Sequence, residues 1–244
     1  MVLRVRRAVL SASLALLALI VQPRTARACG TSGPGGVEAC SLDEHEEAER
    51  PKFRVGVSGV YTWTNIHFSD GTQDDETRAG VLASLSWFLS RRFSLQIGFG
   101  ATLGGQLSAS PAPVYFSPGP AADLGVSWRI LDANGARPFV VLTGLVSFEA
   151  THTTVDVPYE ALDFRLGGVV GWTIGGIVSP FATARAFGGP VYWRDANGSV
   201  TGTDGSHYQV GAGVAASIAK RVDLFAEGVP LGERAVSVGV GVAL

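Results

Sequence analysis

Apolar and polar residues alternate with a period of two along most of the chain after residue 52. Segment 93–103 is typical: its odd positions are mainly large and apolar, and its even positions are Ser94, Gln96, Gly98, Gly100 and Thr102. Successive side chains of a β-strand point to opposite faces. The pattern therefore predicts strands with one apolar face and one face of small or polar residues.

Ten segments fit this description. Regular alternation marks 79–89, 93–103, 122–130, 162–174, 208–218 and 234–244. Less regular strands are expected at 53–68, 138–150, 178–188 and 222–230. After the first 28 residues, no long segment has the periodicity of a helix. We predict an all-β fold of about ten antiparallel strands, with eight or twelve as the alternatives.

The connections between these segments also alternate, in length. Short turns are expected at 90–92, 132–135, 175–176 and 220–221, and longer links at 69–76, 104–118, 151–160 and 189–206. The link 231–234 is the one exception: it is short, although the alternation predicts a long link at that position. Short turns on one side and long loops on the other are typical of outer-membrane barrels, and an even strand number places both termini on the periplasmic, short-turn side.

Composition indicates which face of the strands looks outward. Hydrophobic residues make up 46% of the 244 residues and charged residues only 16%, with 32 glycines. The exterior of a soluble barrel would carry Lys and Glu, whereas the second face here is built from Gly, Ser, Thr and Ala. We therefore expect an up-and-down transmembrane β-barrel over 53–244 with its apolar face toward lipid. A net charge of −2 without a basic patch argues against a nucleic-acid partner.

The few charged residues of the second face have both signs. Ionisable side chains at membrane depth pair with one another or face a watery interior. We expect an interior charge network that either fixes the barrel's register and shape or lines a narrow pore. Its predicted members are Arg54, Arg78, Asp123, Arg129, Glu149, Asp163, Arg165, Arg185 and Glu227.

Aromatic residues gather near the predicted strand ends, as in the interfacial girdles of membrane barrels. The row beside the short turns comprises Trp87, Phe93, Trp128, Phe139 and Trp172. The row toward the loops comprises Tyr61, Trp63, Phe148, Tyr192, Trp193 and Tyr208. The alternative interpretation makes these aromatics the core of a secreted, soluble β-barrel binding protein.

The first 28 residues have the features of a signal peptide: basic residues at 4–7, an apolar run over 8–21 and a small-x-small site at 26–28. The mature chain would begin at Cys29 and carry a periplasmic segment over 29–52. Cys29 and Cys40 would form a disulfide in an oxidising compartment. Lipidation of Cys29 is the alternative, although Arg27 occupies a position where lipoproteins have a small residue.

The segment 29–52 also contains His45 among several carboxylates, which could bind a divalent cation weakly. One His among acidic residues is more often part of a solvated helix face. The segment could also dock on a periplasmic partner.

Residues 53–244 resemble the broad class of small Gram-negative outer-membrane β-barrel proteins. The closing strand 235–244 looks like the C-terminal strand that the barrel-assembly machinery recognises, although Leu244 and Val242 stand where that pattern has aromatic residues. The resemblance implies export to the outer membrane and contact with its lipid and, during insertion, with that machinery. It also implies a non-enzymatic, structural or narrow-pore role for small solutes, without a cofactor.

A hydrolase is the alternative function. Ten-stranded outer-membrane proteases carry Asp and His near the extracellular rim, and this chain has Asp74, Asp75, Asp204 and His207 in predicted loops. An Asp–His pair could activate a water molecule. However, Asp is common in turns for its backbone hydrogen bonds, and the Asp204–His207 spacing departs from the protease pattern. No complete catalytic set is present, so we expect no enzymatic activity.

Overall fold

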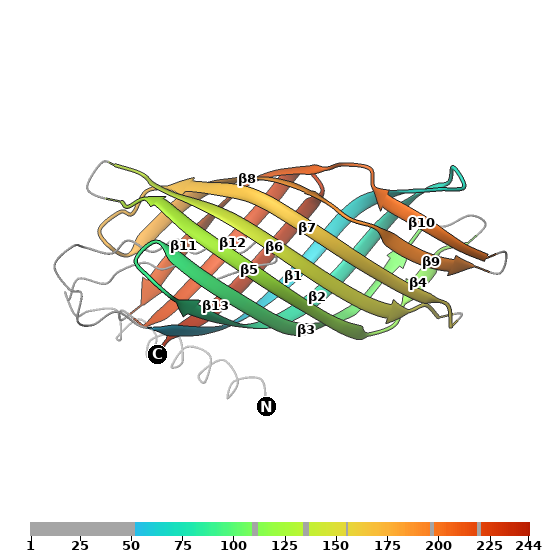
Figure 1. The fold of residues 1–244 in the computed structure, drawn as a ribbon, viewed down its shortest axis with the longest axis horizontal. Coiled ribbons are helices and arrows are strands. Elements are labelled where there is room, and N and C mark those ends of the chain that lie inside the picture. The colour runs from blue at the N-terminus through green and yellow to red at the C-terminus, as the bar shows by residue number, and fades with distance from the viewer. Residues whose placement is uncertain (1–51, 109–111, 134–136, 155, 196–197, 219–220) are drawn as a thin grey trace, which may run out of the picture.

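The computed structural model describes residues 52–244 except 109–111, 134–136, 155, 196–197 and 219–220. Ten long strands form a closed antiparallel barrel (Figure 1). They are β1 (Phe53–Phe68), β2 (Gln73–Phe88), β3 (Phe93–Leu107), β5 (Gly119–Leu131), β6 (Phe139–His152), β7 (Pro158–Gly171), β8 (Val178–Gly188), β11 (Tyr208–Ile218), β12 (Val222–Gly232) and β13 (Arg234–Ala243). Each pairs with the next, and β13 pairs with β1 from Arg234↔Trp63 to Ala243↔Arg54. The predicted all-β barrel of ten strands is confirmed.

Three short strands complete the sheet at the end of the barrel opposite the C-terminus, which we name the loop end; the other end is the turn end. They are β4 (Val114–Phe116), β9 (Val191–Asp195) and β10 (Gly198–Asp204). β4 pairs with β3, and the β9–β10 hairpin pairs with β7 on one side and with β1 on the other. At the loop end the wall therefore runs through β9 and β10 in place of β8, β11, β12 and β13 (Figure 1).

This hairpin corrects the interpretation of 189–206 as a plain link. Gly189-Pro190 and Gly198 are residues typical of turns, and the two strands beside them are too short to show clear alternation. Strands β9 and β10 form because their backbone groups hydrogen-bond to the long strands β7 and β1. The link 104–118 contains β4 for the same reason. The predicted link 69–76 is shorter than expected, because β2 begins at Gln73.

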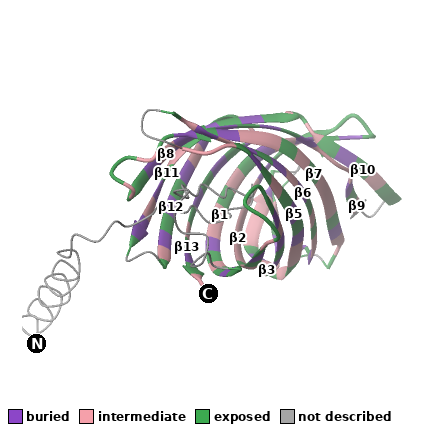
Figure 2. Cartoon of the chain, turned by 60° about the vertical axis from the view of Figure 1, so that its left-hand side comes forward, coloured by how far each residue is buried: buried purple, intermediate pink, exposed green. Residues whose placement is uncertain are grey.

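The two faces of the wall differ as the alternation predicts, and along each strand exposed and buried residues follow one another (Figure 2). Large apolar side chains point outward: Leu124 is 58% exposed and Leu166 is 71% exposed. Small residues point inward. At Gly98 the interior is so crowded that a Cβ atom would overlap the carboxylate of Asp123. Each of the ten long strands exposes at least one large apolar side chain, which a water-soluble barrel would not do.

Two members of the predicted aromatic rows lie inside the barrel. Phe139 is fully buried in the interior, and Trp193 packs against interior apolar residues. Their assignment to the girdles was wrong. Around Phe139 both faces of β6 are apolar, with Val140, Val141 and Leu142 following, so alternation alone does not say which residues point inward. The other nine aromatics of the two rows are exposed on the outer surface.

Within the described ranges, the structure has no helix with the length and hydropathy needed to cross a bilayer. The predicted signal peptide 1–28 and nearly all of the segment 29–52, with Cys29, Cys40 and His45, lie outside the described residues.

We expect Leu124→Arg to lower the free energy of unfolding by about 2–4 kcal/mol, since Leu124 projects outward at mid-height of β5 and an arginine there would face the centre of the bilayer. Urea titration of the protein in phospholipid vesicles, followed by tryptophan fluorescence, measures the change. Leu231→Arg is the matched control: Leu231 also projects outward, but at the loop end of β12, where the cost should be at most about 1 kcal/mol. Equal losses at both positions would contradict the assigned outward belt.

Candidate functional site: the barrel interior

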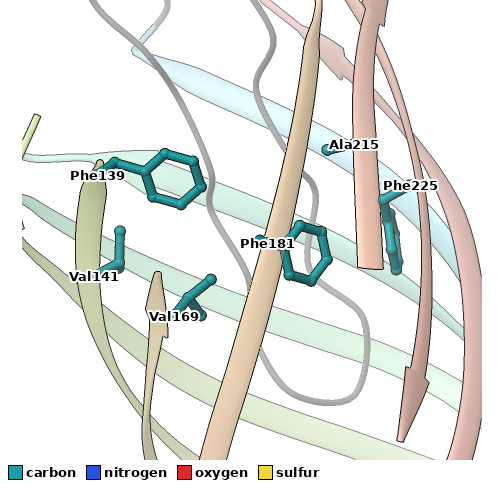
Figure 3. Packing of buried hydrophobic residues seen from close by; sticks show 6 residues of the cluster. All are labelled: Phe139, Val141, Val169, Phe181, Ala215 and Phe225. Atoms are coloured by element: carbon teal, nitrogen blue, oxygen red, sulfur yellow. The ribbon is translucent and has the colours of Figure 1, made fainter. Parts of the chain in front are cut away.

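An apolar cluster fills the interior near the turn end. Figure 3 shows its side chains gathered between the strands that carry them. They come from β6, β7, β8, β11 and β12, and they are Phe139, Val141, Val169, Phe181, Ala215 and Phe225. None is more than slightly exposed, so this turn-end cluster occupies lumen that would otherwise hold water.

A second apolar cluster lies in the interior near the loop end. Its buried members are Ile66, Phe68, Leu107, Phe116, Tyr159 and Val191. The rings of Phe116 and Tyr159 pack with their centroids 4.8 Å apart. The short strands β4 and β9 supply Phe116 and Val191, so the additional wall segments at this end also fill the lumen. This loop-end cluster was not predicted, because its residues lie in several of the less regular strands and links.

The predicted charge network lies between and around these clusters. All nine of its predicted members are on strand positions that face the interior. Three residues that the sequence analysis missed complete their ion pairs: Glu76, Asp223 and Glu233. Glu76 and Glu233 were assigned to links, and Asp223 lies in an irregular strand. For Glu76 the sequence offered a signal, because Arg78 follows two residues later on the same face of β2. For Asp223 and Glu233 it offered none of this kind, because their partners Arg54 and Arg165 lie on β1 and β7, which do not pair with β12.

One part of the network joins β2 to β6 and β7. The Arg78 guanidinium lies 2.8 Å from the Glu76 carboxylate and 2.7 Å from that of Glu149. The Tyr159 hydroxyl donates a hydrogen bond to Glu76 over 3.0 Å, and the Thr102 hydroxyl donates one to Glu149. Because Glu76 is fully buried, these donors replace the water that a carboxylate would otherwise require.

Another part runs continuously around the opposite wall. Arg165 pairs with Asp163 and with Glu233, the latter over 3.1 Å. Gln209 donates a hydrogen bond to Glu233 over 2.8 Å and accepts one from Arg185.

Arg185 in turn pairs with Glu227 over 2.8 Å, and the Thr183 hydroxyl donates a hydrogen bond to the same Glu227 carboxylate. Closer to the turn end, Arg54 pairs with Asp223 over 3.0 Å. The pairs Arg185–Glu227 and Arg54–Asp223 each connect two strands that have a third strand between them, so they stabilise the wall across that third strand.

A cavity of about 130 Å³ lies between the two clusters. The order of residues along β7 shows its height: Val169 belongs to the turn-end cluster, Asp163 and Arg165 line the cavity, and Tyr159 belongs to the loop-end cluster. Its wall combines apolar side chains with the charged residues Arg78, Asp123, Glu149, Asp163, Arg165, Asp204 and Glu233. Asp123 is 7% exposed, and its Oδ1 atom makes no hydrogen bond with the described residues.

The four residues weighed for hydrolysis are not brought together as a catalytic set. Asp204 is partly buried and accepts a hydrogen bond from the Thr64 hydroxyl over 3.0 Å, whereas His207 is exposed. Asp75 is exposed and accepts a hydrogen bond from Asn65, and Asp74 is partly buried. In the described part of the chain, no ion pair links His207 to any of these carboxylates. Nor do three or more His, Cys, Asp or Glu side chains gather there as a metal site.

The ten long strands form a closed antiparallel barrel in which each strand is hydrogen-bonded on both sides. Its outer surface is an apolar belt, and its interior contains small residues and paired charged residues. These features define a transmembrane β-barrel of the bacterial outer-membrane type. This assignment rests on the wall and surface of the chain itself.

No family model and no curated protein sequence matches the chain. Its fold is similar to those of several solved outer-membrane barrels. The outer membrane protease OmpT from Escherichia coli is 10% identical, with 84% of this chain and 99% of that chain covered and a TM-score of 0.46. The β domain of the Bordetella autotransporter BrkA is 12% identical (78% and 99% covered, TM-score 0.46). The translocator domain of NalP from Neisseria meningitidis is 11% identical (81% and 90% covered, TM-score 0.45).

We expect Glu227→Ala to lower the free energy of unfolding by about 3–5 kcal/mol, because it leaves the buried Arg185 guanidinium without its carboxylate. The double variant Arg185→Met/Glu227→Leu should recover most of that loss, since both charges are then gone. Urea titration in vesicles measures each value. Glu160→Ala, an exposed outward position on β7, is the control and should change stability by less than about 0.5 kcal/mol. A double variant as unstable as Glu227→Ala would argue against the pair as the cause.

Proposed function

We propose that this protein is a non-enzymatic outer-membrane barrel whose lumen is closed to the free passage of solutes, so that its role is structural. The observation that carries the proposal is the presence of two separate apolar clusters at different heights in the interior. Ten strands enclose a space that side chains can nearly fill.

The interior side chains support a closed barrel. An apolar constriction opposes the passage of ions, because water and ions are poorly stabilised between apolar side chains. The interior arginines make ion pairs with neighbouring carboxylates, as Arg185 does with Glu227 and Arg78 with Glu149. Paired charges of this kind are suited to fixing the wall. A narrow pore for small solutes, the second candidate, would require both clusters to move.

The lack of enzymatic activity is part of the proposal. Its support is the separation of the exposed His207 from the interior, where Asp204 is held by Thr64. Hydrolysis of a peptide or lipid by the purified protein, abolished by either Asp204→Asn or His207→Ala, would contradict it.

We also propose export by the segment 1–28 followed by assembly through the C-terminal strand. The basic, apolar and small-residue regions of that segment support export. Intact-mass spectrometry of the protein purified from outer membranes is expected to give a chain beginning at Cys29, two mass units lighter when Cys29 and Cys40 are bonded than after reduction. A mass increased by acyl chains would show lipidation instead.

The closed lumen is tested by electrical recording in planar bilayers. We expect the unmodified protein to give no stable conductance steps. The variant Phe116→Ala/Phe225→Ala, which removes one large ring from each cluster, should raise ion flux, because it widens both constrictions.

The matched control is Tyr115→Ala/Leu224→Ala. These residues precede Phe116 and Phe225 on the same strands but point outward. This control variant should give no stable conductance steps, like the unmodified protein. Stable steps from the unmodified barrel, of the size given by the inner variant, would contradict the proposal and favour the narrow pore.

A further inference from the structure

The cavity between the two clusters contains a carboxylate whose charge is not offset. Asp123 lies on β5, opposite Gly98 of β3 and Ser147 of β6, and lines the cavity. It is 7% exposed, the side-chain amide of Gln96 lies near enough to interact with its carboxylate, and its Oδ1 atom has no hydrogen-bond partner among the described residues. A buried carboxylate in this condition is costly unless a cation or a donor comes to it.

The charges around Asp123 do not supply that cation. The cavity wall carries two guanidinium groups, of Arg78 and Arg165, and five carboxyl groups, of Asp123, Glu149, Asp163, Asp204 and Glu233. With all of them ionised, the formal charge of the wall is therefore −3. Each arginine is already bonded to two carboxylates: Arg78 to Glu76 and Glu149, and Arg165 to Asp163 and Glu233. The cavity thus favours a positively charged occupant.

The rest of the wall indicates the kind of cation. Apolar side chains form much of the lining, among them Val60, Leu82, Leu145 and Val191. Among the described residues no three potential metal ligands gather, so the cavity does not offer the ligand set that a metal ion requires. The volume, about 130 Å³, would hold on the order of ten water molecules and therefore a small organic molecule.

We propose that this cavity binds a small organic ammonium ion with a short aliphatic chain, whose ammonium group donates to Oδ1 of Asp123 and whose chain contacts Leu82 and Leu145. This inference goes beyond the structural role proposed above, since a closed barrel requires no ligand. The cavity lies between the two clusters, so a ligand enters it past the side chains of one of them.

The experiment is equilibrium dialysis of n-butylammonium against the whole purified protein in detergent micelles, with n-butanol as the uncharged probe of similar size. We expect saturable binding of n-butylammonium and much weaker binding of n-butanol. Asp123→Asn, which keeps the shape but removes the charge, should weaken n-butylammonium binding by about 10-fold to 100-fold. Asp75→Asn, an exposed carboxylate on the outer face of β2, is the matched control and should leave binding unchanged.

A second variant keeps the proposal testable if Asp123→Asn does not fold, which migration on SDS gels without heating will show. Leu145→Phe places a larger side chain in the cavity wall and should weaken binding of both probes. The proposal is overturned if n-butylammonium does not saturate, if n-butanol binds equally well, or if a folded Asp123→Asn variant binds n-butylammonium as the unmodified protein does.

Discussion

The structure depends on the pairing of β1 with β13, because this one ladder turns a sheet into a closed wall. In lipid, an unpaired backbone N–H or C=O group cannot be satisfied by water. An open ten-stranded sheet would leave two such edges in the membrane. Once β13 bonds to β1 from residue 234 to residue 243, no edge is left along that length. The β9–β10 hairpin extends the same principle to the loop end, where it covers the part of β1 that rises above β13.

Closure of the barrel limits the volume of its interior, and many of the inward-facing residues are small enough to fit that volume. Glycine at position 98 leaves room for the Asp123 carboxylate, and small residues line most of β13. Large inward side chains are concentrated in the turn-end and loop-end clusters. Between them, arginine–carboxylate pairs connect strands distant in sequence, such as β8 with β12 through Arg185 and Glu227. The interior therefore stabilises the wall from within and leaves a cavity beside Asp123.

The functional proposals follow from this division of the lumen. We propose that the apolar clusters oppose conduction, and that the acidic, partly apolar cavity between them binds a small cation. The two proposals concern different residues. The proposed block to conduction involves Phe116 and Phe225, whereas the proposed cation binding involves Asp123, which belongs to neither cluster.

The sequence by itself determined the ten strands, their main turns and the outward belt, since side chains that alternate along a strand must lie on alternate faces. It also assigned nine charged residues to the face of small and polar residues. It did not determine the clusters, the hairpin β9–β10 or the partners Glu76 and Glu233. Where both faces of a strand are apolar, as around Phe139, alternation carries no information about direction. Only the tertiary structure decided these features, because strand register and closure bring together residues that are far apart in the chain.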